Sequence, residues 1–381
     1  MSNRSETEIG IIGGGLAGLF SAIVLAKKGH QVALFEKKEY PFHRVCGEYI
    51  STEVSPLLEH LGLFPHQFKP SQISRVMISS SLGSTLKSPL AMGGFGISRY
   101  SLDRYWAQIA QELGVQLFTG TSVENYQFEK DSFQLQLSGE KSFSVRTLIA
   151  AYGKRSKLDL LKNRSFTTKR SPYVGVKYHI RMPFPADLIA LHNFPGGYCG
   201  LSAIEDGKLN LCYLAGREGL RAAGNIEQFE RQVLQQNPYL KEVWEKAEFL
   251  FEKPEVINEI SFAPRSPVED HALMVGDTAG LITPLCGNGM AMAIHSAWLA
   301  ANLSSKHLKG ELSREALEKQ YAQEWGKRFS TRLMAGRNLQ KLFGERFTTD
   351  LAIRFFGAMP VLTRKLISLT HGKTLDPCAS I

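Results

Sequence analysis

The stretch TEIGIIGGGLAG (residues 7–18) constrains the fold of this chain more than any other feature. Residues 7–13 have the apolar, β-branched pattern of a buried strand, and residues 16–29 have helical spacing that ends at Gly29, a natural helix C-cap. Residues 31–36 (QVALFE) form a second predicted strand. A strand, a helix and a strand in this order predict two parallel strands joined by a right-handed crossover.

Three glycines in this stretch fit the spacing G-x-G-x-x-G: Gly13, Gly15 and Gly18. The first permits a tight turn, the second lets a pyrophosphate approach the backbone, and the third lets helix and strand pack closely. The helix that follows offers free N–H groups and its positive dipole end to phosphates. Glu36 closes the second strand, where a carboxylate can accept hydrogen bonds from ribose hydroxyls. The motif therefore predicts a dinucleotide site, and the alternative is that the glycines serve packing alone.

A second glycine-rich region, from Met274 onwards, indicates which dinucleotide is bound. A predicted strand ends at Gly276-Asp277, and Pro284, Gly287 and Gly289 follow before another predicted helix. A carboxylate at this place can hydrogen-bond a flexible polyol, and the N-terminus of the helix can face a flat ring and stabilise negative charge on it. A nicotinamide dinucleotide has no ribityl chain for such a carboxylate, whereas FAD has one. The predicted cofactor is therefore FAD.

The sequence resembles the p-hydroxybenzoate hydroxylase-like FAD superfamily, which contains aromatic hydroxylases, flavin-dependent halogenases and geranylgeranyl reductases. The resemblance covers about residues 8–305 and rests on four motifs: GIIGGGLAG through Glu36, RVCGE (44–48), RYSLD (99–103) and VGDTAGLITPLCGNGMAMAIHSA (275–297). It implies that Asp277 contacts the ribityl chain of FAD and that Pro284, Gly287 and Gly289 lie over the isoalloxazine. It further implies FAD contacts from Arg44 and, near the phosphates, from Arg99.

The second motif looks most like the reductase and halogenase branches, where a Cys-Gly pair lies close to the flavin. The resemblance implies a catalytic role for Cys46, and the alternative is a small buried residue in a tight loop. Tyr152 stands where hydroxylases of the group carry an acid that serves FAD and NADPH, which argues against direct reduction by NADPH. NADPH or NADH is kept as a candidate electron donor. The W-x-W-x-I-P motif of the halogenases is absent, which argues against halogenation.

The order of the predicted elements indicates an α/β chain. A Rossmann-type FAD-binding domain with a parallel sheet is interrupted by an antiparallel-sheet substrate domain, and a helical C-terminal region follows. Further helices are predicted at 103–113, 226–248, 288–307 and over most of 314–371, and strands of the antiparallel sheet at 173–182, 189–194, 198–204 and 208–215. The predicted parts of the FAD-binding domain are 1–70, 99–160 and 266–310, those of the substrate domain are 71–98 and 161–265, and the C-terminal cap is 311–381.

Among the polar residues of these elements, Asp103 is expected near the N-terminus of its helix. His179, His192 and His295 are expected to be structural rather than catalytic, and no Ser-His-Asp array is evident.

The basic charge of the chain is confined to one region. The chain has 45 Lys and Arg against 36 Asp and Glu, a net charge of +9, and residues 325–373 hold ten of these basic residues and two of the acidic ones. Charge confined to one region disfavours nucleic-acid binding. Apolar residues alternate with basic ones there, so the region can lie on a membrane surface, and the alternative is a helical pair packed over both domains with a solvated basic face.

The sequence also predicts where the protein is located. No run of 18 apolar residues without charge occurs, and the amino terminus leaves no room for a signal peptide. The five cysteines have no C-x-x-C spacing, which indicates neither a disulfide framework nor a zinc site. We expect a cytoplasmic protein, with peripheral contact to the inner face of the membrane through 325–373 as an open alternative.

The leading hypothesis for function is an FAD-dependent monooxygenase that hydroxylates a hydrophobic aromatic or polyketide-like small molecule of secondary metabolism. The alternative is an enzyme like geranylgeranyl reductase, which reduces isoprenoid double bonds. A third hypothesis, a lipid-binding escort protein without redox chemistry, is disfavoured by the intact Glu36 and Asp277.

Overall fold

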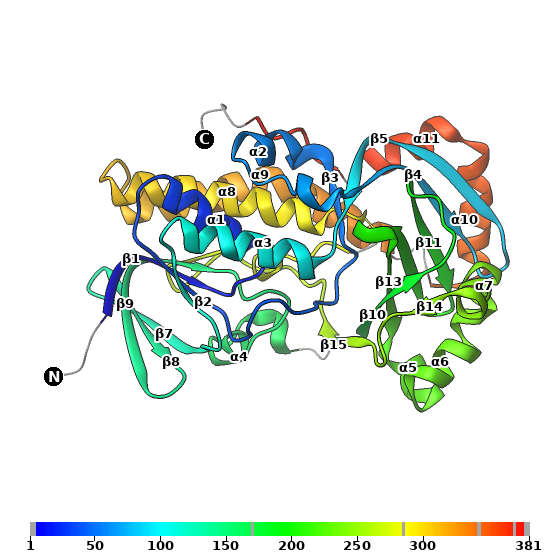
Figure 1. Cartoon of the computed structure of the whole chain (residues 1–381), viewed down its shortest axis with the longest axis horizontal. Coiled ribbons are helices and arrows are strands. Elements are labelled where there is room, and N and C mark those ends of the chain that lie inside the picture. Colours follow the sequence, from blue (N-terminus) through cyan, green and yellow to red (C-terminus); the bar gives the residue numbers. More distant parts are fainter. Residues whose placement is uncertain (1–4, 169–170, 284–285, 341–343, 369–370, 377–381) are drawn as a thin grey trace.

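The computed structural model describes residues 5–168, 171–283, 286–340, 344–368 and 371–376, which form two sheets with helices packed against each (Figure 1). The first sheet is mostly parallel and is built from distant parts of the sequence. Its spatial order is β16 (Val268–Glu269), β17 (Ala272–Met274), β9 (Lys141–Ala150), β1 (Ser5–Ile12), β2 (Val32–Phe35) and β6 (Gln116–Phe118). The hairpin of β7 (Val123–Glu129) and β8 (Ser132–Leu137) pairs with β9.

The predicted strand–helix–strand unit is confirmed. Strands β1 and β2 pair in parallel with Ile9 opposite Val32, and α1 (Leu16–Lys27) connects them. Four helices lie on one side of the first sheet: α1, α3 (Arg99–Glu112), α8 (Gly289–Leu308) and α9 (Arg314–Gln340) (Figure 1). Every residue of α1 from Leu16 to Leu25 is buried, because α3 and α8 pack against it as well as the sheet.

Two glycines allow α1 to start directly against β1. Gly13 has φ +100°, a conformation that L side chains rarely adopt. A Cβ on Gly18 would lie 1.9 Å from the carbonyl oxygen of Gly13. The helix can therefore approach the end of the strand only with a glycine at this position, as the motif predicts.

The second sheet is mostly antiparallel, and among the strands that the structure describes only β4 and β11 pair in parallel. Its spatial order is β14 (Glu248–Phe249), β10 (Tyr173–Arg181), β13 (Leu209–Gly216), β12 (Gly197–Ala203), β11 (Leu188–Phe194), β4 (Ser71–Ser79), β5 (Thr85–Gly96) and β3 (Tyr49–Ser51), with β15 (Glu255–Ile260) also paired to β10. One face packs on α5 (Arg217–Ala223), α6 (Ile226–Gln232) and α7 (Pro238–Lys246). The α/β fold with a parallel and an antiparallel sheet is confirmed.

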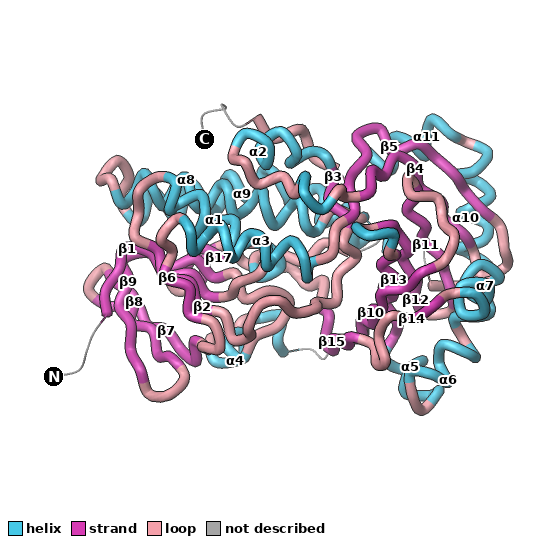
Figure 2. The backbone as a smooth tube through the Cα atoms, viewed as in Figure 1, coloured by secondary structure: helices cyan, strands magenta, loops and turns pink. Residues whose placement is uncertain are grey.

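The remaining helices lie outside these layers. They are α2 (Ser55–His60), α4 (Lys157–Leu161), α10 (Arg346–Ala358) and α11 (Pro360–Ser368). Helices α10 and α11 contact β5 at the far end of the second sheet, and loops are concentrated where the two sheets meet (Figure 2). Strand β3 pairs with β5, so residues 49–51 contribute to the second sheet although they fall within the first predicted segment, 1–70. The domain boundaries themselves stay predictions.

Two details of the predicted helices are wrong. The single helix predicted over 226–248 is divided, because Pro238 cannot continue a helix and Asn237 caps the next one. The buried Asn237 side chain also donates to the carbonyls of Ser80 and Asn193 at 3.1 and 3.0 Å. The helix predicted over 103–113 begins four residues earlier, with Ser98 as its N-cap, so Asp103 lies in the second turn.

Every helix of the described residues is too short or too polar to cross a lipid bilayer.

Substituting Gly18 tests the close approach of helix and strand. Gly18→Ala should lower the free energy of unfolding by about 1–3 kcal/mol or more, because the new methyl group overlaps a fixed backbone carbonyl. Gly326→Ala in α9 is the matched control, because its Cβ would meet only Ser330 Oγ at 3.8 Å. The control should raise stability by up to about 1 kcal/mol. Equal unfolding free energies for the two variants in urea titration would contradict the packing argument.

Candidate active site

The loop between β1 and α1 forms an open cradle for an anion. Gly15 is the N-cap of α1 and offers no side-chain cap, and the first turn carries no acidic residue. A Cβ on Gly15 would lie 3.5 Å from a guanidinium nitrogen of Arg99 and 3.9 Å from the guanidinium carbon of Arg44. The free N–H groups of the helix and two cations thus converge on one small space, which suits a pyrophosphate.

Carboxylates hold both arginines in place. Arg99 donates from Nε and Nη2 to the two oxygens of Asp103, each at 2.7 Å, and Arg44 donates from Nε to Asp103 at 3.1 Å. Burial acts to lower the pKa of Arg99, but Asp103 outweighs it and raises that pKa, so the guanidinium stays charged. Asp103 therefore orients two cations at the cradle rather than stabilising the start of its helix, which corrects the role expected from the sequence.

Glu36 lies under the cradle at the end of β2. Its Oε2 accepts from the N–H of Gly14 at 2.9 Å and from Arg44 at 3.0 Å, and its Oε1 accepts from the N–H of Lys38 at 3.0 Å. A carboxylate oxygen can accept a second hydrogen bond, so Oε1 can also bind a ribose hydroxyl. The carboxylate both shapes the loop and lies where a dinucleotide ribose is expected.

The turn after β17 holds Asp277. Its backbone carbonyl accepts from Arg265 at 2.9 Å, and the neighbouring Thr278 hydroxyl accepts from the N–H of Gly153 at 2.8 Å. Among the described residues no group donates to the Asp277 carboxylate, which is partly exposed. The turn is held by its backbone and leaves the carboxylate available for a polyol, and the ribityl contact of Asp277 stays a prediction.

The start of α8 is the second helix N-terminus of the site. Gly287 has φ +64°, and a Cβ there would lie 3.3 Å from the Tyr49 ring. Asn288 is the N-cap without a side-chain cap bond, and Gly289 is the first helical residue. Both glycines therefore lie at an uncapped, positive helix end, which suits a ring that carries negative charge. Pro284 lies outside the described residues.

Buried Glu53 ties this helix start to the C-terminal region. It accepts from Asn288 Nδ2 at 3.4 Å, from Arg332 of α9 at 3.0 Å and from the N–H of Gly372 at 2.6 Å. The segment that follows α11 is thereby fixed beside the loop expected to cover the flavin.

Cys46 lies in a loop between the two sheets and is a partly buried free thiol. Its carbonyl accepts from Asn210 Nδ2 at 3.2 Å, and the carbonyl of Val45 accepts from Lys154 Nζ at 2.9 Å. The loop is thus held from both sides. The catalytic role of Cys46 stays a prediction.

A buried charged cluster next to this loop was not predicted. Glu48 Oε2 hydrogen-bonds His179 Nε2 at 2.7 Å, and Oε1 accepts from the backbone N–H of Arg99 at 2.8 Å and from Lys177 Nζ. Glu48 and Lys177 are fully buried, and His179 is nearly so. Burial opposes the ionisation of Glu48, but Lys177 and the His179 hydrogen bond outweigh it and lower the Glu48 pKa to about 2. One sequence signal was available: strand alternation places Lys177 and His179 on the same face of an otherwise apolar segment.

Two of the three histidines, His179 and His192, have hydrogen-bonded surroundings. His179 bonds Glu48, and His192 bonds Ser79 at 2.8 Å and stacks on Tyr239. Burial lowers the pKa of His192 to about 4 and that of His295 to about 3.

Tyr152, expected to stand where the hydroxylases carry an acid, donates to Asp159 at 3.1 Å.

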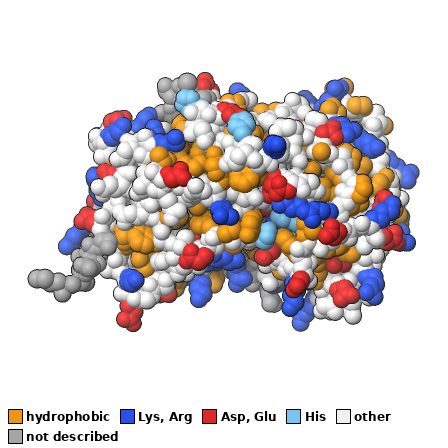
Figure 3. Space-filling model, viewed as in Figure 1, with side chains coloured by type: hydrophobic (Ala, Val, Ile, Leu, Met, Phe, Trp, Pro, Cys, Tyr) orange, Lys and Arg blue, Asp and Glu red, His pale blue; other side chains and the backbone are white. Residues whose placement is uncertain are grey.

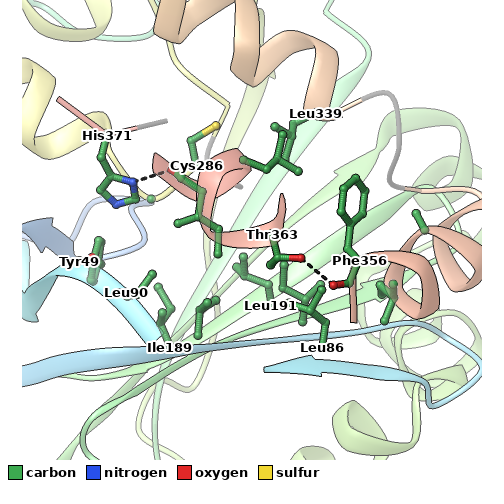
Figure 4. A pocket seen from close by; sticks show the side chains of 17 residues that line it. Tyr49, Leu86, Leu90, Ile189, Leu191, Cys286, Leu339, Phe356, Thr363 and His371 are labelled. Atoms are coloured by element: carbon green, nitrogen blue, oxygen red, sulfur yellow. Dashed lines mark hydrogen bonds between the residues drawn. The ribbon is translucent and has the colours of Figure 1, made fainter. Parts of the chain in front are cut away.

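An apolar cavity lies between the second sheet and the C-terminal helices (Figure 4). On the sheet side, aliphatic residues line it: Val76, Ile78, Leu86, Leu90, Ile189 and Leu191. On the helix side, it is lined by Leu339, Ala352, Ile353, Phe356, Thr363, Leu366 and Ile367, and further residues are Tyr49, Cys286, Gly287 and His371. The cavity thus reaches the loop expected to cover the flavin. Cys46 is not among the described residues that line it.

The sheet face that lines the cavity changes character from strand to strand. Cross-strand pairing aligns one row as Lys177, Cys212, Gly200, Leu191 and Ile78. The neighbouring row is His179, Asn210, Ser202, Ile189 and Val76. Burial raises the pKa of the Cys212 thiol to about 12, so the middle of the face is neutral. The face therefore runs from charged, through small and polar, to purely aliphatic.

Comparison with known proteins identifies the family of this chain. A family model described as an FAD binding domain matches residues 6–335. The chain is 24% identical over 371 residues to conditioned medium factor receptor 1 of Dictyostelium discoideum, which covers 86% of this chain and 69% of that protein. It is 23% identical to tryptophan 2-halogenase of Chondromyces crocatus (82% of this chain, 63% of that protein) and 23% identical to digeranylgeranylglycerophospholipid reductase 2 of Methanopyrus kandleri (91% and 89%). The chain spans less than two thirds of the length of the halogenase.

Solved structures share the fold. The flavin-dependent brominase Bmp2 matches with a TM-score of 0.78 at 18% identity, covering 98% of this chain and 95% of that one. PqsL of Pseudomonas aeruginosa in complex with 2-aminobenzoylacetate matches with a TM-score of 0.73 at 18% identity, covering 91% and 99%.

Removing the Asp277 carboxylate tests the polyol contact. Asp277→Ala should retain flavin about ten- to a hundredfold less tightly, because a hydrogen bond to a charged group is lost. Flavin absorbance per protein after gel filtration measures this. Glu59→Ala, an exposed acid on α2, is the control. Full flavin occupancy in Asp277→Ala would rule out the ribityl contact.

Truncating Glu48 tests the buried cluster. Glu48→Ala should lower the free energy of unfolding by about 3–5 kcal/mol, because Lys177 is left buried without a counter-charge. The double variant Glu48→Ala, Lys177→Met should recover much of that loss. Glu227→Ala, which breaks the exposed pair with Arg231, is the control and should cost under about 1 kcal/mol. A double variant as unstable as Glu48→Ala would contradict the charge argument.

Proposed function

Because the chain belongs to the FAD binding domain family, as an FAD-dependent oxidoreductase of the p-hydroxybenzoate hydroxylase-like group, we propose that it hydroxylates an amphiphilic aromatic small molecule. The polar ring of the substrate lies beside the flavin, and its apolar part occupies the cavity. Bound FAD, once reduced, supplies the chemistry by activating O₂ and delivering an oxygen atom to the ring.

The observation that carries this proposal is the change of character along the second sheet. The cavity wall is aliphatic at Ile78, Leu191 and Ile189, and the neighbouring strands present Ser202 and Asn210 on the same face. A substrate that is only a hydrocarbon chain could not hydrogen-bond Ser202 or Asn210. An aromatic ring with a hydroxyl or amino group matches both parts.

The amide oxygen of Asn210 is a specific candidate for a hydrogen bond to the polar part of the substrate. Its Nδ2 donates to the carbonyl of Cys46, which fixes the orientation of the amide. Its Oδ1 is buried, and no described residue hydrogen-bonds it. A buried acceptor without a partner is costly, so we assign Oδ1 to an O–H or N–H group of the bound substrate or cofactor.

The residues of the chain have distinct roles in this proposal. The cradle at Gly13–Gly15, with Arg44 and Arg99, binds the pyrophosphate, while Glu36 and Asp277 accept from the ribose and the ribityl chain. The aliphatic wall and the C-terminal helices exclude water from the reacting ring, which protects a reactive cofactor from side reactions. NADPH or NADH is the proposed source of electrons.

The second candidate is the reduction of isoprenoid double bonds. It is favoured by the Cys46-Gly47 pair, by the aliphatic cavity and by the reductase relative that the chain nearly spans. It is disfavoured because Cys46, its expected catalytic residue, is not among the described residues that line the cavity.

Oxygen dependence separates the two candidates. Purified flavoprotein is reduced chemically and offered a long-chain alkylresorcinol or geranylgeraniol, with and without O₂. A hydroxylase should consume O₂ with the resorcinol and form no product anaerobically, because the inserted atom comes from O₂. Anaerobic saturation of geranylgeraniol would replace our proposal by the reductase. A protein that cannot be reconstituted with FAD would overturn both.

A further inference from the structure

Large apolar side chains are exposed on the outer side of α10, of α11 and of Met359, which joins them. Six of them fall within 16 consecutive residues: Phe347 (76% exposed), Leu351 (70%), Phe355 (51%), Met359 (43%), Val361 (74%) and Leu362 (39%). We call these six residues the outer apolar face. A contiguous exposed apolar patch on a protein surface marks an interaction site.

Helix α10 is apolar on two opposite sides. Phe347, Leu351 and Phe355 recur every four residues on the exposed side. Ile353 and Phe356 lie on the other side and line the cavity. An ordinary surface helix has a polar outer face, so the outer face of α10 is built to contact something other than water.

The outward orientation of these side chains is fixed by the inner contacts. Asp350 accepts from the Ser80 hydroxyl at 2.5 Å, and the Thr363 hydroxyl of α11 donates to the Phe356 carbonyl at 2.7 Å. Ile353 is 3% exposed. Rotating α10 to bury its outer face would break these contacts, so the exposure belongs to the folded state.

Basic residues surround the outer apolar face. Arg346, Arg364 and Lys365 are exposed on the same two helices, and Arg354 is largely exposed and ion-paired with Asp350 at 2.8 Å. Of the acids in this segment, Asp350 is buried and Glu345 is exposed. In the space-filling view, hydrophobic and basic side chains lie next to one another at the end of the molecule that α10 and α11 form (Figure 3).

We propose that the outer apolar face binds the surface of an anionic lipid membrane. Apolar side chains with cationic neighbours match the acyl boundary and the negative headgroups of such a surface. No described helix can span a bilayer, so α10 and α11 lie in the interface.

A second copy of this chain fits the same surface poorly. Two copies meeting through one shared patch bring the same set of charges to both sides of the interface. Both sides would then carry the exposed cations Arg346, Arg364 and Lys365, and like charges across an interface oppose association. Anionic lipid supplies the opposite charge instead.

This position gives the cavity a source of substrate, a step that rests on the proposed function. The same two helices contact lipid with Phe347, Leu351 and Val361 and the cavity with Ile353 and Leu366. One layer of helix therefore separates the membrane from the cavity. A membrane bound at the outer apolar face would therefore hold a lipid-soluble amphiphile one helix layer away from the cavity.

Vesicle binding of the full chain tests the proposal. The probes are vesicles of phosphatidylcholine alone and of phosphatidylcholine mixed with phosphatidylglycerol, followed by co-sedimentation. The chain should bind the anionic vesicles, and salt should weaken the binding. The variant Phe347→Ser, Leu351→Ser, Val361→Ser should bind at least about tenfold more weakly, and Arg364→Gln, Lys365→Gln about tenfold more weakly.

The controls use the same substitutions elsewhere on the surface. Leu160→Ser, Leu161→Ser removes two exposed apolar side chains of α4, and Lys241→Gln removes an exposed charge of α7. Both should bind like the unaltered chain. The triple serine variant should keep its flavin content and melting temperature, because its residues line no part of the cavity.

Three outcomes would overturn the proposal: no binding to anionic vesicles, equal binding by the triple serine variant, or a dimer without lipid that this variant abolishes. The last outcome would make the face an interface between copies. Vesicle binding with no oxygen-dependent turnover would overturn the proposed hydroxylase and leave the membrane surface in place.

Discussion

The buried carboxylate of Glu48 holds the two halves of this molecule in register. It joins the N-terminus of α3, through the N–H of Arg99, to Lys177 and His179 on β10. Because the backbone of Arg99 is fixed there, its guanidinium reaches the cradle at Gly15. Because Lys177 is neutralised there, the charged end of the second sheet can be buried against the first. This ion cluster thus helps to set the distance between the cradle and the face of the second sheet that lines the cavity, together with Glu205, which accepts from Ser98 at the same helix start.

The parts of the fold that sequence could predict are those with a short-range cause. The glycines at 13, 15 and 18 and the alternation in β10 to β13 act within a few residues, so the parallel unit and the antiparallel sheet were predicted correctly. The division of the 226–248 helix had a local signal in Pro238, which cannot continue a helix, and the prediction overlooked it. The contacts that hold Asn237 could not be read from a local pattern, because Ser80 and Asn193 lie far away in sequence.

The candidate site shows the same limit. Gly15, Glu36, Arg44 and Arg99 meet at the cradle, as the motifs suggested. The partners of Glu48 lie 129 and 131 residues away, and no local pattern joins them. Asp103 was misplaced because the helix begins at Arg99, and only the folded chain shows that it pairs with two arginines.

Helices α10 and α11, which cover the cavity, come late in the sequence, and this order affects how the protein folds during synthesis. The last strand of the first sheet ends at Met274, and the last strand of the second sheet ends at Ile260. Helices α10 and α11 extend to Ser368. During synthesis, the aliphatic residues of the second sheet that line the cavity therefore emerge long before the helices that cover them. The nascent chain carries an uncovered apolar surface until residues 346–368 have been translated, the kind of surface that chaperones bind.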